Sequence, residues 1–96
     1  MKSDRLELVN FILDNLADMQ GEGSFAYKKY PTIRDLTRMV NDNDRMGQLT
    51  FQGVRNVILK LESAGLVRQV KTSTSTKIRI ELLKWTWDRN EPYPRA

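Results

Sequence analysis

The sequence predicts a small α+β domain, mainly α-helical, that ends in a β-hairpin. Apolar residues recur at helical spacing in three segments before residue 65, which predicts three helices with a buried face each. Beyond residue 65, two short runs flank a stretch of five small hydroxyl residues, a pattern typical of two strands and a turn. A length of 96 residues, 40% of them hydrophobic, suits one small core. We therefore expect one domain over residues 1–88 and an irregular tail over residues 89–96.

The first helix is expected from Ser3 to about Met19. Its apolar residues cover about half of the helix circumference, which is more than one small core requires. They are Leu6, Leu8, Val9, Ile12, Leu13, Leu16, Ala17 and Met19. Phe11 stands among the polar residues of the other side. Either the C-terminal tail covers the surplus apolar surface or a second subunit does, and the sequence leaves both alternatives open.

The second helix is expected to follow Pro31, because a residue that precedes proline is kept out of helical geometry. Thr32 is placed to cap this helix, and Asp35 is placed to complete a capping box. Its buried stripe is Ile33, Leu36 and Val40, with Arg34 and Arg38 on the opposite face. Ahead of it, Phe25-Ala26-Tyr27 is expected to form a short strand.

The third helix is expected over residues 50–64, after a loop over residues 41–48 that is rich in Asn, Asp and Gly. Thr50 is its predicted N-cap, and Leu49 and Val54 are spaced to form a hydrophobic staple. The buried stripe is Val54, Val57, Ile58 and Leu61. Gly65 supplies the left-handed residue at which helices commonly end. The loop is longer than the turn of a tight helix-turn-helix.

The end of this helix and the start of the hairpin carry a family signature. Leu61-Glu62-Ser63-Ala64-Gly65-Leu66-Val67 is similar to the Leu-Glu-x-x-Gly-Leu-Val/Ile pattern of winged helix-turn-helix domains. The resemblance covers roughly residues 4–82, in the order helix-strand-helix-helix-strand-strand. It implies DNA binding, with the recognition helix 50–64 in the major groove and the wing 68–79 on the flanking backbone or minor groove.

Charge is distributed unevenly along the chain. The whole sequence has a net charge of +4, but residues 1–24 carry −3, residues 25–49 carry +2 and residues 50–84 carry +5. A chain that is acidic at one end and basic over its helix and hairpin predicts an oriented surface for a polyanion.

The candidate DNA-binding residues follow from this arrangement. Arg55 suits guanine edges, Gln52 and Asn56 suit adenine edges, and Lys60 suits a phosphate. The full predicted set is Arg34, Thr50, Gln52, Arg55, Asn56, Lys60, Arg68, Lys71, Thr72, Ser73, Thr74, Ser75, Thr76 and Lys77. Gly53 costs about 1 kcal/mol of helix propensity relative to Ala, which predicts a close approach to DNA or to the second helix. The competing interpretation is an ordinary solvated helix face and a polar hairpin tip.

The segment after the hairpin holds two tryptophans. The apolar alternation of the second strand changes phase at Leu83, Trp85 and Trp87, which predicts a bulge or a change of surface. On a strand, the two tryptophans would share one face. Together with Phe11, they are the predicted interface of a homodimer, and the alternative is that they fold back over the first helix of the same chain.

Several classes of function are disfavoured. The chain has no Cys and no His, so disulfides are excluded and the usual zinc ligands and nucleophile–base pairs are missing. We expect a cytoplasmic protein that is not an enzyme, with no cofactor, metal, small-molecule ligand or membrane span. The predicted function is sequence-specific binding of double-stranded DNA, as a small transcriptional regulator or a phage or plasmid replication or partition accessory factor. The alternative, favoured by Leu59 on the recognition face, is a winged-helix adaptor that binds another protein.

Overall fold

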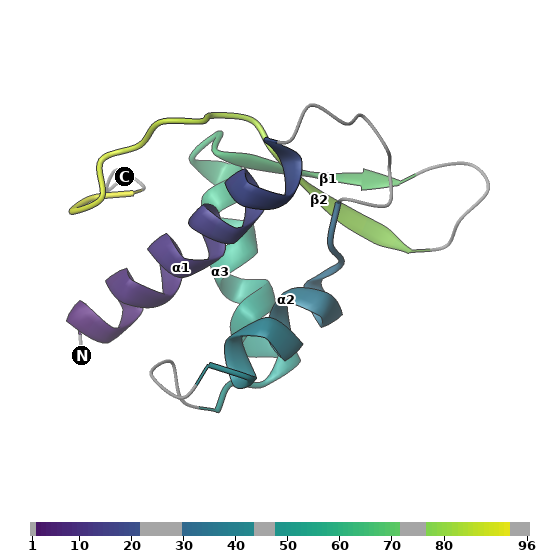
Figure 1. Ribbon diagram of the computed structural model, residues 1–96, viewed down its shortest axis with the longest axis horizontal. Coiled ribbons are helices and arrows are strands. Elements are labelled where there is room, and N and C mark those ends of the chain that lie inside the picture. The colour runs from purple at the N-terminus through teal and green to yellow at the C-terminus, as the bar shows by residue number, and fades with distance from the viewer. Residues whose placement is uncertain (1, 22–29, 44–47, 72–76, 93–96) are drawn as a thin grey trace.

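The computed structural model describes residues 2–21, 30–43, 48–71 and 77–92 (Figure 1). It is a small α+β domain in which three helices precede an antiparallel two-stranded hairpin, as the sequence predicts. The elements are α1 (Lys2–Gln20), α2 (Ile33–Asn41), α3 (Phe51–Ser63), β1 (Val67–Lys71) and β2 (Ile78–Leu82). The strand expected at Phe25-Ala26-Tyr27 lies outside the described residues. No described helix has the length and apolar character needed to span a membrane.

The core lies between the three helices and the inner face of the hairpin. Its residues on α1, α2, α3 and the hairpin are Leu8, Val9, Ile12, Leu13, Leu16, Ile33, Leu36, Val40, Val54, Val57, Ile58, Leu61, Leu66, Val67, Ile80 and Leu82. The buried stripes expected for the second and third helices are therefore confirmed. Figure 1 shows α1 crossing in front of α3, with the hairpin extending from the end of the domain at which α1 finishes.

Local hydrogen bonds set the ends of α2 and α3. The Asp35 backbone N–H donates to Thr32 Oγ1 at 3.1 Å, and the Thr32 backbone N–H donates to Asp35 Oδ2 at 3.0 Å, which completes the predicted capping box. The Gly53 backbone N–H donates to Thr50 Oγ1 at 3.0 Å, which confirms the cap of α3. Gly65 follows α3 with a φ of 79°, a left-handed conformation that side chains disfavour.

The hairpin register separates its two faces. Val67 lies opposite Leu82 and Lys71 opposite Ile78, so residues of even number on β2 and odd number on β1 face the core side. The chain that enters α2 runs along the free edge of β2, because the Ile80 backbone N–H donates to the Pro31 carbonyl at 2.8 Å. A bridge between Thr32 and Arg79 continues this pairing. The start of α2 is therefore held beside the hairpin.

The segment after β2 leaves the sheet and passes over α1 (Figure 1). Beyond β2, the Leu66 carbonyl accepts the backbone N–H of Leu83 at 2.8 Å and that of Lys84 at 3.3 Å. The apolar alternation of β2 therefore changes at Leu83 because the chain leaves the sheet there and packs on another surface. The expectation that Trp85 and Trp87 share a strand face is wrong, because residues 83–92 contain no strand. The ring of Trp85 lies over Gly21, where an added Cβ would come within 3.3 Å of Trp85 Cζ3.

A polar clamp fastens this segment to α1. Trp87 Nε1 donates to Asn10 Oδ1 at 2.7 Å, and Asn10 Nδ2 donates to the Arg89 carbonyl at 2.8 Å and to the Leu6 carbonyl at 3.1 Å. Arg89 also donates two hydrogen bonds of 2.9 Å to the Asp14 carboxylate, and this pairing raises the pKa of the guanidinium. Trp87 is half-buried against the core, which agrees with the alternative that this segment folds back over the first helix of the same chain.

Candidate functional site

The outward side of α3 carries the predicted base-reading residues. Gln52, Arg55 and Asn56 are all exposed, and so is Lys60 in the last turn. Gln52 Nε2 donates to Asn56 Oδ1 at 3.0 Å, so the two amides lie one helical turn apart and are joined. Two linked amides beside a guanidinium offer several hydrogen-bond donors and acceptors along one row of side chains on the exposed side of α3.

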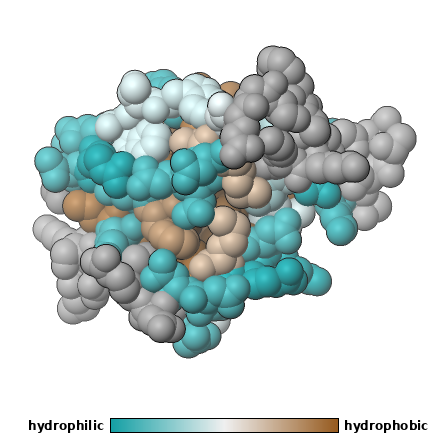
Figure 2. Space-filling view, in the orientation of Figure 1, coloured by the Kyte–Doolittle hydropathy of each residue, from teal (hydrophilic) through white to brown (hydrophobic). Residues whose placement is uncertain are grey.

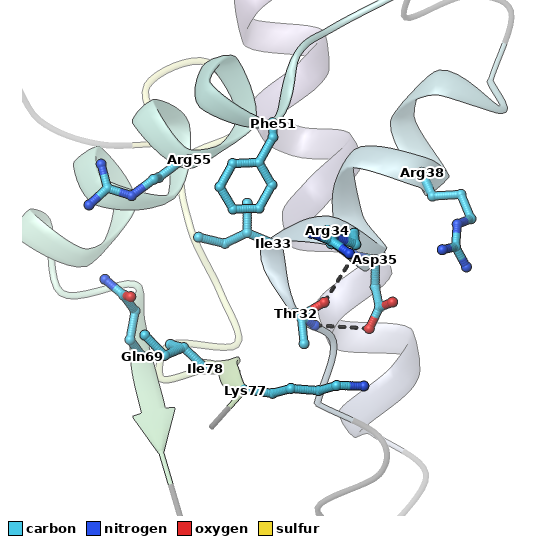
Figure 3. A pocket seen from close by; sticks show the side chains of 10 residues that line it. All are labelled: Thr32, Ile33, Arg34, Asp35, Arg38, Phe51, Arg55, Gln69, Lys77 and Ile78. Atoms are coloured by element: carbon cyan, nitrogen blue, oxygen red, sulfur yellow. Dashed lines mark hydrogen bonds between the residues drawn. The ribbon is translucent and has the colours of Figure 1, made fainter. Parts of the chain in front are cut away.

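Next to this row lies a hollow of about 750 Å³ between α2, α3 and the hairpin (Figure 3). It is lined by Thr32, Ile33, Arg34, Asp35, Arg38, Phe51, Arg55, Gln69, Lys77 and Ile78. Four of these side chains are cationic and one is a carboxylate. The cations come from three separate elements, because Arg34 and Arg38 belong to α2, Arg55 to α3, and Lys77 directly precedes β2. The fold therefore concentrates positive charge at this place.

The carboxylate of the hollow has a structural task. Asp35 accepts the backbone N–H of Thr32, and this hydrogen bond is the main cause that lowers the pKa of the Asp35 carboxyl. The nearby charges of Arg38 and Arg79 lower it further. Asp35 is thus held ionised at the first turn of α2. Within the part of the chain that the structure describes, no ion pair joins a carboxylate to Arg34, Arg38 or Arg55.

Two apolar residues of the hollow are exposed, and sequence analysis did not identify either as functional. Phe51 is 47% exposed and Ile78 is 43% exposed. Ile78 shares a face of the hairpin with Ile80, but it is exposed because the hairpin extends beyond the core at that point. Phe51 precedes Val54 by one helical turn, so periodicity alone places it beside the buried stripe. The sequence feature that could mark Phe51 as functional is its position directly after the N-cap residue Thr50.

Phe51 separates two hollows. Besides the larger one, it lines a smaller hollow of about 330 Å³ together with Arg34, Thr37, Arg38 and Asn41. Figure 3 shows its ring over Ile33, with Arg55 to one side and Arg34 to the other. An exposed aromatic ring thus stands between cationic side chains of two helices.

The predicted hairpin residues do not all lie together. Lys77 lines the hollow, and Lys71 is exposed opposite Ile78 in the register. Arg68 lies on the other face of the hairpin, where it forms an ion pair with Glu81. Glu81 Oε2 also accepts the Tyr30 hydroxyl at 3.3 Å, and burial, followed by the Glu81 charge, raises the pKa of that phenol. Residues 72–76 lie outside the described residues.

Three further residues at or near the start and middle of α3 have different surroundings. Thr50 is exposed, and its hydroxyl accepts the capping hydrogen bond. A Cβ added at Gly53 would meet only Thr50 Oγ1, at 3.4 Å, so the expected close approach of this glycine to the second helix is wrong. Leu59, which favours the adaptor alternative, is half-buried rather than exposed.

We refer to Arg34, Arg38, Phe51, Gln52, Arg55, Asn56 and Lys77 as the cationic face. On α1, Asp14 pairs with Arg89 of the docked C-terminal segment, and Asp18 is exposed. Comparison with known proteins finds no matching family model, no similar curated protein and no matching solved structure.

Proposed function

We propose that the protein binds double-stranded DNA with sequence specificity, as a winged helix-turn-helix domain. The observation that carries the proposal is the gathering of Arg34, Arg55 and Lys77 from three elements around one hollow, beside the exposed amides of α3. Protein–DNA interfaces combine cations that contact phosphates with planar polar groups that read base edges. The cationic face has both kinds of group, next to each other.

The proposal assigns α3 to the major groove. There Gln52, Arg55 and Asn56 contact base edges, since amides match adenine N6 and N7 and a guanidinium matches guanine O6 and N7. Arg34 and Arg38 on α2 and Lys77 on the hairpin contact phosphates on either side, which sets the register of the helix. Lys60 contacts a phosphate further along the same groove.

The topology supports the winged-helix assignment. The chain before α2 pairs with the free edge of β2 through Pro31 and Thr32, so three chain segments lie side by side at the base of the hairpin. The third helix ends at Ser63, and Gly65 then leads the chain into β1, which agrees with the signature at residues 61–67. In this arrangement the hairpin is the wing.

The biological role that fits is occupancy of a DNA site. A small cytoplasmic transcriptional regulator acts in this way, as does an accessory factor for phage or plasmid replication or partition. The second candidate is a winged-helix adaptor for another protein, and the exposure of Ile78 favours it.

Selection from random duplex DNA, followed by a salt titration, tests the proposal. If about four cations contact phosphates, the affinity falls by roughly 100-fold between 50 and 200 mM salt, because the bound counterions are released. The selected sites also report the sequence and its symmetry. An adaptor shows no enrichment of any sequence, and this result, or an affinity independent of salt, contradicts DNA binding.

The hairpin lysines provide a test of the wing. Replacement of Lys71 and Lys77 by Ala is expected to weaken specific and non-specific binding by similar factors, because phosphates carry no sequence information. The slope of log affinity against log salt becomes shallower by about 1 to 2. Lys84→Ala is the matched control, since Lys84 is exposed at the end of the hairpin opposite its tip. An unchanged slope in the double variant places the hairpin off the DNA.

We also propose that the protein forms a homodimer through α1. The docked segment accounts for Trp87, but Figure 2 shows apolar surface that remains along α1 and toward α2, bordered by polar side chains. Phe11 on α1 and Met39 on α2 are half-buried apolar residues of these helices. A two-fold dimer would present two copies of α3 to half-sites about one helical turn apart, or a multiple of it.

Sedimentation at micromolar concentration checks the dimer. The expected species has twice the chain mass of 11.2 kDa. Phe11→Asp is expected to dissociate it and to lower DNA affinity, because a charge enters the interface while every base-reading residue stays in place. Circular dichroism shows whether this variant remains folded. A single wild-type species at the mass of one chain contradicts the dimer, and leaves the monomeric DNA-binding proposal intact.

A further inference from the structure

We propose that Phe51 recognises the 5-methyl group of a thymine in the major groove, an inference that rests on the proposed DNA binding. It makes Phe51 a specificity-determining residue, in addition to the polar groups of α3. The methyl group is the single apolar feature that a base pair presents in the major groove, and contact with an apolar side chain is the way in which proteins read it.

The position of Phe51 fits this role. It is the first residue of α3, and in helix-turn-helix proteins the N-terminal residues of the recognition helix contact base edges. The residue is 47% exposed, although a residue that served only the core would be covered. It lines both hollows, so it places an exposed aromatic ring among the cationic side chains of α2 and α3, and Ile78 is the other exposed apolar residue there.

The neighbouring charges hold a duplex against this ring. Arg34 and Arg55 lie on either side of Phe51 (Figure 3), and each can contact a phosphate or a guanine. A protein partner of the same surface would have to be acidic, whereas DNA supplies regularly spaced negative charge together with methyl groups. The combination of an exposed aromatic ring and surrounding cations therefore favours DNA over a protein as the occupant.

The adjacent residues complete the reading of one base pair. Gln52 follows Phe51 directly, and its amide is joined to that of Asn56. Such an amide matches adenine N6 and N7, and the partner of adenine carries the thymine methyl group. Gly53 leaves the first turn of α3 open, because an added Cβ there would meet only Thr50 Oγ1. One T·A pair thus offers a methyl group to Phe51 and an adenine edge to Gln52.

The test replaces thymine by deoxyuridine, which removes the methyl group and keeps every hydrogen-bonding atom. The full chain is titrated with its selected duplex, in which each thymine is changed singly. We expect about a fourfold loss of affinity at one or two adjacent positions, the effect of burying one methyl group. For Phe51→Ala, the ratio of thymine to deoxyuridine affinities at these positions falls to about one. Leu83→Ala, which changes an apolar residue that is 44% exposed outside the cationic face, keeps the wild-type ratio.

The outcomes separate this inference from the proposed function. If the wild-type chain binds its selected duplex with equal affinity at every deoxyuridine position, Phe51 does not read thymine, while the DNA-binding proposal stands. The same conclusion follows if Phe51→Ala keeps the wild-type ratio. If no duplex is selected and Phe51→Ala abolishes capture of a protein partner, both proposals fail. Thermal unfolding of Phe51→Ala verifies that an altered ratio does not come from a loss of folding.

Discussion

Arg55→Ala is expected to weaken binding of the selected duplex by about 5- to 150-fold, which corresponds to roughly 1–3 kcal/mol for one bidentate base contact. Arg55 is exposed on α3 and faces the same hollow as Arg34 and Lys77, so its loss removes a base contact and leaves the core intact. Preference should relax at one base position of the site. Quantitative binding to a set of single-base variants of that site measures both effects.

Two variants make the result specific. Arg55→Lys keeps the charge but lacks the planar fork, so it should retain non-specific affinity and lose discrimination at the same base position. Lys84→Ala removes one positive charge outside the cationic face and should leave the preferred site nearly unaffected. The proposed role of α3 is excluded if Arg55→Ala and Asn56→Ala both bind the selected site with wild-type affinity.

Asn10→Leu is expected to lower the free energy of unfolding by about 2–4 kcal/mol, because it removes a buried amide and leaves its partners without their hydrogen bonds. Asn10 is 8% exposed, accepts from Trp87 Nε1 and donates to the Arg89 carbonyl. A loss of this size is a large part of the 5–15 kcal/mol typical of a whole domain. Urea unfolding followed by circular dichroism measures it.

A double-mutant cycle isolates the hydrogen bond between the two side chains. Trp87→Phe removes the indole donor, and the double variant should be less destabilised than the sum of the single variants, with a coupling of about 1 kcal/mol. Asn56→Ala is the matched control, since it removes an exposed amide and should change stability by less than about 0.5 kcal/mol. Additive effects of the two changes would show that Asn10 and Trp87 do not act together.

Local sequence signals were sufficient for most of the fold. The buried stripes of α2 and α3, the capping box at Thr32 and the glycine stop at Gly65 each depend on residues within one or two helical turns. Helical periodicity and capping chemistry act at the same short range, so the sequence could predict these features. The alternation and turn residues likewise predict strands over residues 66–71 and 77–82, and each observed strand begins one residue later.

Other features depend on contacts between distant segments. The pairing of Arg68 with Glu81 is set by the register of the hairpin, and that register also removes Arg68 from the cationic face. The exposure of Phe51 and Ile78 depends on where the core ends, which no local pattern records. The polar residue Asn10 could be assigned to the solvent side of α1 from its type alone, whereas it is buried by a segment almost eighty positions away.

The clamp between α1 and the C-terminal segment also constrains the order in which the chain can fold. Its hydrogen bonds join residues that are 75 to 79 positions apart, so most of the domain is synthesised between the two sides. While the chain grows from the ribosome, Asn10 must remain hydrated until Trp87 has emerged. The contacts between α1 and β2 close loops of 60 to 62 residues, whose entropy cost is almost the same because it grows slowly with loop length. The contact between α1 and residues 83–92 can therefore form only after the hairpin that precedes this segment has been synthesised.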